Sequence, residues 1–168
     1  MRYVTLKQNL SYKIDMRDFF KTNSYYEGLI QNLYAGSNGC FSMFMHFFYQ
    51  FTQSAVFFEG YKSCFEKLYQ AELENSRILS ELLIKIGGDN KFYSSSRKFL
   101  SGNNVDYIKN SSQIFSYDVE MIEVSILECK SLINKIDDNN IKQYLHRILD
   151  NKKLEMKILK EQYFSLKS

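Results

Sequence analysis

The stretch FEKLYQAELENSRILSELLIKI, residues 65–86, decides the fold. Taking every third or fourth residue selects seven positions on one face of an α-helix: Phe65, Leu68, Glu72, Asn75, Leu79, Leu82 and Ile86. Two of the seven, Glu72 and Asn75, are polar. Polar groups in the middle of a buried stripe are costly unless they meet partners. The stripe therefore predicts a buried helix that faces polar side chains on its neighbours.

Three further stretches have apolar residues at helical spacing. The stripe in residues 25–53 is Leu29, Leu33, Gly36, Cys40, Met43, Phe47 and Phe51. The stripe in residues 116–136 is Val119, Ile122, Ile126, Ile133 and Ile136, and the one in residues 141–163 is Ile141, Leu145, Ile148, Lys152, Glu155 and Leu159. The chain contains no proline, which suits long uninterrupted helices. The sequence thus predicts four helices, over residues 25–53, 59–86, 116–136 and 141–163.

The connections predict how these helices pair. Gly87 and Gly88 end the second helix, and the Ser-, Asn- and Gly-rich residues 87–112 form a connection long enough to run the length of a bundle. The turn at residues 137–140 is short, so the last two helices should be antiparallel neighbours. We predict an all-α fold, with a lead segment at residues 1–24 and one four-helix bundle at residues 25–168.

Each stripe includes or adjoins residues that are unusual in an apolar core. In chain order they are Cys40, Glu72, Asn75, Glu123, Lys152 and Glu155. They are distributed over the four helices as one, two, one and two. Carboxylate-bridged di-metal bundles have the same distribution, because two helices provide a Glu each and two provide Glu-x-x-His. The six positions are therefore candidates for one shared site inside the bundle.

At this point the sequence resembles the ferritin-like superfamily, in particular its rubrerythrin- and manganese-catalase-related bundles. Residues 34–50, YAGSNGCFSMFMHFFYQ, are similar to the family's YAG-x-x-SELTA-x-x-QY-x-YQ, and residues 72–90, ELENSRILSELLIKIGGDN, to E-x-x-H followed by L-GELI-x-x-LGGDP. The pattern E-x-x-AI falls on residues 123–127, and R-I-x-x-DE-x-x-H on RILDNKKLE at residues 147–155. The resemblance covers residues 25–163 and implies a ferritin-like four-helix bundle.

The resemblance also implies which ligands are altered. Glu72 and Glu123 match family glutamates, whereas Cys40 and Lys152 stand in place of the other two. Asn75 and Glu155 stand in place of the two histidines. Family activity is redox chemistry at a di-iron or di-manganese centre, and a cation on Lys152 would repel both metal ions. The resemblance therefore implies that this activity is lost.

Two functions follow as hypotheses. In the favoured one, the protein is a non-catalytic structural or partner-binding module without a cofactor, and a buried ionic cluster replaces the metals. Lys152 should then lie within salt-bridge reach of Glu72 or Glu123. The alternative is a metal-binding oxidoreductase with one iron, zinc or manganese ion held by Cys40, Glu72, Glu123 and Glu155. Whether the protein is an enzyme stays open at this stage.

The two histidines lie outside the six positions. His46 follows Cys40 by six residues, or about 240° round a helix. It should therefore face away from the shared site, as a packed or half-exposed side chain. The same is expected of His146.

The composition bears on partners and location. The net charge of +3 includes no long single-sign block, so nucleic acid is not expected as a partner. Cys40, Cys64 and Cys129 form no C-x-x-C pair and the N-terminus has no apolar leader, which together favour the cytoplasm. Polar residues interrupt the apolar run at residues 40–58, so no membrane span is predicted. The 14 Phe and 13 Tyr leave room for a sticky outer face, suited to a homodimer or a protein partner.

Overall fold

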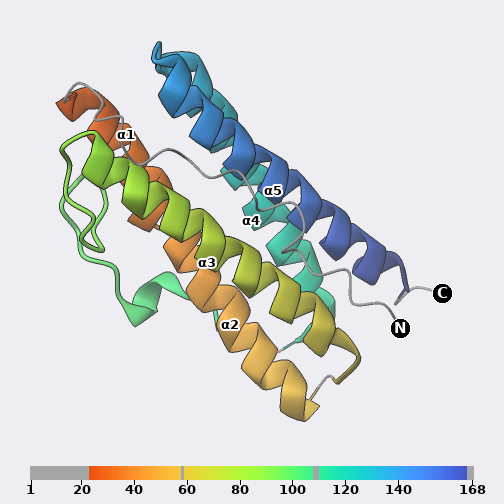
Figure 1. The fold of residues 1–168 in the computed structure, drawn as a ribbon. Coiled ribbons are helices and arrows are strands. Elements are labelled where there is room, and N and C mark those ends of the chain that lie inside the picture. Colours follow the sequence, from red (N-terminus) through yellow and green to blue (C-terminus); the bar gives the residue numbers. More distant parts are fainter. Residues whose placement is uncertain (1–22, 58, 108–109, 166–168) are drawn as a thin grey trace.

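A computed structural model describes residues 23–57, 59–107 and 110–165. Five α-helices run within these ranges: α1 (Ser24–Ala35), α2 (Cys40–Phe57), α3 (Lys62–Lys85), α4 (Ser111–Lys135) and α5 (Asn139–Ser165). Figure 1 shows α2, α3, α4 and α5 side by side, with α1 continuing the line of α2. The predicted lead segment at residues 1–24 lies outside the described residues, except for its last two.

The first predicted helix is divided in two. Residues 36–39 separate α1 from α2, where one helix over residues 25–53 was predicted. The chain folds so closely here that a Cβ atom on Gly36 would lie 2.5 Å from the Asn32 carbonyl oxygen, and one on Gly39 would lie 2.8 Å from the Gly36 nitrogen. The Ser42 hydroxyl donates to the Gly36 carbonyl (2.7 Å). Two glycines therefore permit the break and a serine of α2 stabilises it.

The predicted end of the second helix is confirmed. Helix α3 ends at Lys85, and Gly87 follows with φ 79°, the left-handed conformation that glycine adopts without strain. The crossover to α4 contains a short 3-10 helix (Gly102–Asn104) and a single β-bridge between Tyr93 and Phe99. Apart from that bridge, the described residues contain no β-structure. Helix α4 begins at Ser111, five residues earlier than predicted.

The helices form two antiparallel hairpins, α2–α3 and α4–α5, which pack together mainly through α3 and α5. The predicted all-α four-helix bundle with a long crossover is therefore confirmed. Its interior has two apolar clusters, one around Leu79 and Leu145 and the other around Leu68 and Phe115. No helix in the described part of the chain combines the length and the apolar character that a membrane span requires.

Candidate functional site

Five of the six predicted positions come together between the two apolar clusters. None is more than 1% exposed; they are Cys40 on α2, Glu72 and Asn75 on α3, and Lys152 and Glu155 on α5. We call these five residues the central cluster. Helical spacing explains the arrangement, because each i, i+3 pair on α3 and α5 projects from one helix face toward the other hairpin.

Lys152 is the cation of the central cluster. Its ammonium group lies 2.5 Å from Glu72 Oε1 and 3.4 Å from the Met43 sulfur, and both Lys152 and Glu72 side chains are fully buried. Burial favours the neutral amine, but Cys40, Glu72 and Glu155 together raise the pKa of Lys152 above its usual range. The predicted salt bridge is confirmed, with Glu72 as the partner.

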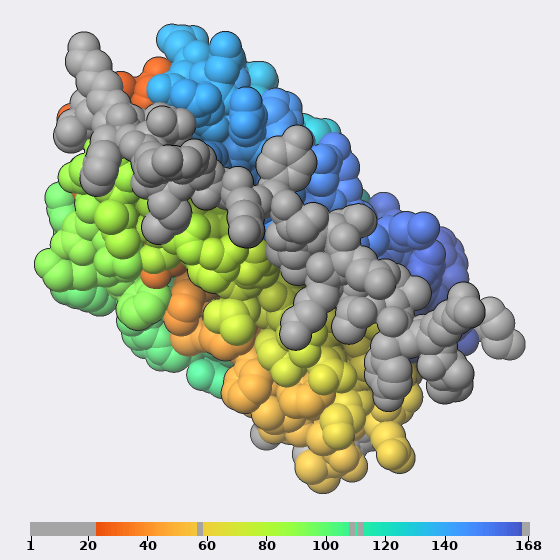
Figure 2. Space-filling model, in the orientation of Figure 1, coloured from red at the N-terminus to blue at the C-terminus, as the bar shows by residue number. Residues whose placement is uncertain are grey.

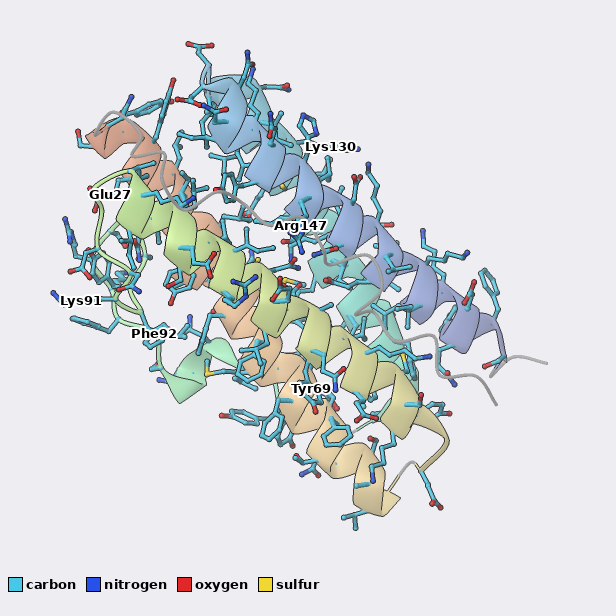
Figure 3. The ribbon with its side chains drawn as sticks, viewed as in Figure 1. Glu27, Tyr69, Lys91, Phe92, Lys130 and Arg147 are labelled. Atoms are coloured by element: carbon cyan, nitrogen blue, oxygen red, sulfur yellow. The ribbon has the colours of Figure 1, made fainter. Side chains whose placement is uncertain are left out.

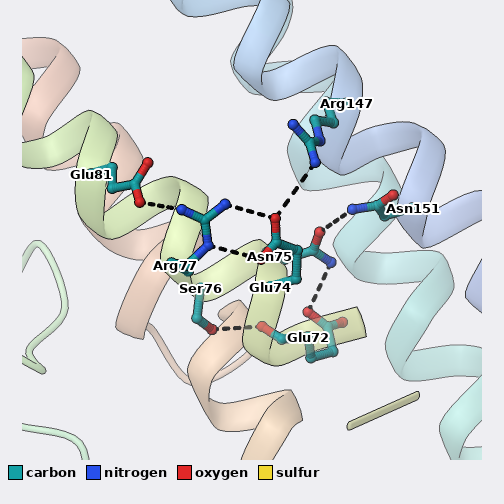
Figure 4. A network of polar contacts seen from close by, with 8 residues as sticks. All are labelled: Glu72, Glu74, Asn75, Ser76, Arg77, Glu81, Arg147 and Asn151. Atoms are coloured by element: carbon teal, nitrogen blue, oxygen red, sulfur yellow. Dashed lines mark hydrogen bonds and ion pairs between the residues drawn. The ribbon is translucent and has the colours of Figure 1, made fainter. Parts of the chain in front are cut away.

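Asn75 joins the two carboxyl groups. Its amide nitrogen donates to Glu72 Oε2 (3.3 Å) and to Glu155 Oε1 (3.1 Å). Its carbonyl oxygen accepts a hydrogen bond from Asn151 on α5 (2.7 Å). Figure 4 shows Asn75 between Glu72 and Asn151. Where the resemblance places a metal-binding histidine, this chain therefore has an amide whose nitrogen and oxygen both have partners and which links α3 to α5.

The remaining acidic groups of the cluster favour their neutral forms. Burial and the negative charge of Glu72 raise the pKa of Glu155 well above its usual range, although Lys152 and Asn75 oppose the shift. Burial likewise raises the pKa of the Cys40 thiol. Lys152 and Glu72 thus form the buried ion pair of the cluster, beside a carboxyl and a thiol whose neutral forms burial favours.

The prediction for Glu123 is wrong. Its side chain is 57% exposed on α4 and lies 3.7 Å from Lys160, outside the bundle. The interior face of α4 instead contains Asp118, Ile122, Ser125 and Cys129, all fully buried. This face is rotated by about one residue from the stripe chosen on Val119 and Ile126, which are only half-buried. Three of its members are polar or thiol-bearing, so an apolar stripe does not reveal it.

Sequence reasoning therefore missed two residues of the site, Cys129 and Met43. The Cys129 thiol donates to the Leu145 carbonyl (3.4 Å), and burial raises its pKa to about 11 while Lys152 acts to lower it. Met43 accepts from the Lys152 ammonium. The 3–4–3 spacing of Ile122, Ser125, Cys129 and Leu132 is the signal that could have identified this face.

A second buried polar pair, His46 and Asp118, joins α2 to α4. His46 Nε2 on α2 is 2.8 Å from Asp118 Oδ1 on α4, and both side chains are almost completely buried. Burial raises the pKa of Asp118, and the hydrogen bond with His46 opposes that shift. His46 is packed and takes no part in the central cluster, as its angle from Cys40 predicts. His146 is exposed.

Asp118→Ala should lower the free energy of unfolding by about 1–3 kcal/mol, because His46 would lose its partner in the core. Chemical denaturation measures the difference. Asp150→Ala is the matched control, since the Asp150 side chain is 72% exposed, and it should change stability by less than about 0.5 kcal/mol. Equal effects of the two substitutions would contradict a stabilising role for the His46–Asp118 pair.

The donor set of the central cluster does not fit a pair of metal ions. Among the described residues, no three His, Cys, Asp or Glu side chains are arranged to hold a metal. The space beside Glu72 is taken by an ammonium group, whose charge would repel a divalent cation. The only imidazole buried in the described chain, His46, is engaged with Asp118.

Comparison with known proteins identifies the architecture. No protein-family model matches the chain, and no curated protein matches its sequence. Two crystal structures of KatB, a manganese catalase from Anabaena, share its fold. The first superposes with a TM-score of 0.78 at 14% identity, over 88% of this chain and 74% of KatB. The second, from Anabaena PCC7120, gives 0.79 at 14% identity, over 89% and 75%.

The fold is ferritin-like. The resemblance on residues 25–163 is thereby confirmed for the architecture. At 14% identity the comparison says nothing about ligands, so the chemistry of the centre rests on this chain's own residues.

Proposed function

We propose that this protein is a non-catalytic ferritin-like module with a structural or partner-binding role. In this proposal the central cluster is a degenerate di-metal site. The Lys152 ammonium provides the positive charge beside Glu72 that the lost metal ions would have provided. The observation that carries the proposal is the 2.5 Å contact between Lys152 Nζ and Glu72 Oε1 at a fully buried position.

Charge balance supports this function. A di-metal site needs several ionised carboxylates to neutralise two divalent cations. The central cluster has the Lys152–Glu72 ion pair and a second carboxyl whose neutral form burial favours. Its ammonium and carboxylate compensate each other without metal, and the cluster links α3 of one hairpin to α5 of the other.

Metal analysis tests the proposal directly. Protein purified without chelator should contain far less than one equivalent of iron, manganese or zinc by mass spectrometry. It should neither oxidise ferrous iron nor dismutate hydrogen peroxide above a buffer control. Stoichiometric iron or manganese together with turnover would overturn the proposal.

The competing hypothesis is a mononuclear metal-dependent oxidoreductase. Cys40, Glu72 and Glu155 would be its ligands, since thiolate and carboxylate together suit zinc or iron. Exposed Glu123 no longer belongs to that set. One equivalent of metal that is lost in both Cys40→Ser and Glu72→Gln would favour this hypothesis. Metal content that is unchanged in both variants would count against it.

The proposed setting is the cytoplasm, without nucleic acid. All three cysteines, Cys40, Cys64 and Cys129, are free and buried, which suits a reducing compartment. The partner of the module is a protein, either a second copy or a different chain.

A further inference from the structure

One outer surface of the α2–α3 hairpin is built from aromatic side chains. We call it the aromatic face; its members are Phe41, Phe44, Phe48 and Phe51 on α2, Tyr69 and Leu73 on α3, and Phe92 on the crossover. The α2 members recur at i, i+3, i+7 and i+10, on one side of the helix. Figure 2 shows α2 (orange) bordering α3 (yellow to green) on the visible side, and Figure 3 labels Tyr69 and Phe92.

The rings of the aromatic face contact one another in sequence. Ring centroids are 4.4 Å apart for Phe41 and Phe92, 5.4 Å for Phe41 and Phe44, and 6.1 Å for Phe44 and Phe48. Tyr69 extends the series, 5.5 Å from Phe48. The rings thus support each other as a continuous surface, whose shape is set before any partner binds.

This surface is left partly open to solvent. Phe48 is 45% exposed, and Leu73 and Phe92 are 46% exposed. Each half-exposed ring leaves about 100 Å² of apolar area in water, so the face offers several hundred Å². Continuous apolar patches of this size mark interaction sites on soluble proteins. With a polar rim, the face approaches the roughly 800 Å² per partner of an ordinary protein interface.

The face has both a recess and a half-exposed ring beyond it. Next to its Phe41 end is a groove of about 470 Å³, with walls that include Tyr34, Phe41, Leu73 and Phe92. Further along α2, the Phe48 ring is 45% exposed. The charged groups at the groove are already paired, because Arg77 lies 2.8 Å from Glu74 and also pairs with Glu81, and Arg147 lies 3.5 Å from Glu74. The groove therefore adds no uncompensated charge that would repel an identical surface.

We propose that the aromatic face binds the same face of a second copy of this chain, about a two-fold axis. Each copy would place its Phe48 ring in the groove of the other. A half-exposed ring and an apolar recess on one surface provide the self-complementarity that a two-fold interface needs, whereas a different partner would require only one of the two. Phe48 follows Phe41 by seven residues, about 10 Å along the helix, so the axis passes near Phe44.

This inference rests on the partner-binding half of the proposed function and names the partner. It is independent of the metal content of the central cluster. A monomeric protein without metal would refute the homodimer alone, and a dimer with metal and turnover would refute the non-catalytic role alone.

Sedimentation velocity over a wide range of protein concentration tests the homodimer. The wild-type chain should show a reversible species of twice the chain mass. Phe48→Glu and Leu73→Glu should each weaken its dimerisation at least about 30-fold, as expected for central interface residues. Leu127→Glu is the control, because Leu127 is 64% exposed on α4, in the other hairpin. Circular dichroism of both face variants reports whether the helices are kept.

Cross-linking tests the two-fold geometry. Phe44→Cys should form a disulfide-linked dimer under mild oxidation, because the two copies of residue 44 would meet at the axis. The native cysteines are buried and should not interfere, and Leu127→Cys should stay uncross-linked. A wild-type chain that stays monomeric, or a dimer that survives both face variants, would overturn the proposal. A dimer without the residue 44 cross-link would overturn its two-fold arrangement.

Discussion

Replacing Lys152 with alanine is expected to lower the free energy of unfolding by about 3–5 kcal/mol at neutral pH. The substitution removes the ammonium 2.5 Å from Glu72 and leaves a carboxylate with no counter-charge in a fully buried site. Denaturant unfolding followed by circular dichroism measures the loss. Lys153→Ala is the matched control, because its side chain is 54% exposed and its ion pair with Asp150 should contribute no more than about 1 kcal/mol.

Lys152→Met separates charge from packing. Methionine fills most of the same volume without a charge. If the salt bridge is responsible, this variant should therefore be nearly as unstable as Lys152→Ala. If the cavity were responsible, methionine would restore stability. A neutral-pH loss below about 1 kcal/mol for Lys152→Ala would contradict the role assigned to the central cluster.

The loss of unfolding free energy caused by Lys152→Ala should also depend on pH. Without the ammonium, the fully buried Glu72 carboxylate has no counter-charge. Acid removes this cost because carboxyl groups can be protonated there. The difference from wild type should therefore be smallest near pH 4 and should widen toward neutral pH.

The central cluster was predicted from sequence on α3 and α5 because both helices display their polar pairs within clear apolar stripes. Glu72 and Asn75 are flanked by Leu68 and Leu79, and such a break in a stripe is visible without a structure. The rule was less accurate on α4, where the buried face includes Asp118, Ser125 and Cys129. The stripe there contained the buried Ile122, Ile133 and Ile136, but Val119 and Ile126 are only half-buried and Glu123 beside them is exposed.

The sequence did not predict the α1–α2 break or the members of the aromatic face, for different reasons. Residues 36–39 keep helical spacing on both sides, so the stripe continues through a break that depends on close backbone contacts at two glycines. The aromatic excess suited a sticky outer face, but periodicity did not show which rings of α2 would form it. In the structure, Phe47 is fully buried and Phe48 is 45% exposed, because one helix face cannot hold every ring of so dense a run. Which rings remain outside is decided by tertiary packing.

Glu155→Gln is expected to raise stability at neutral pH. The Glu155 carboxyl has a folded-state pKa well above its usual 4.5, because burial and Glu72 disfavour its charged form. In the unfolded chain it ionises near the usual value. Above about pH 4.5, folding must therefore return a proton to Glu155, and stability falls by up to about 1.4 kcal/mol per pH unit until the folded-state pKa is reached.

Glutamine mimics the protonated carboxyl and needs no proton. Its carbonyl oxygen can accept the Asn75 hydrogen bond that Glu155 Oε1 accepts at 3.1 Å. The variant should be more stable than wild type at pH 7, and it should lose the corresponding pH dependence. Unfolding measured from pH 4 to pH 8 tests both effects. Glu123→Gln, at a 57% exposed position, should change neither. A Glu155→Gln variant less stable than wild type at pH 7 would show that Glu155 is ionised, and the centre would then contain two carboxylates beside one ammonium.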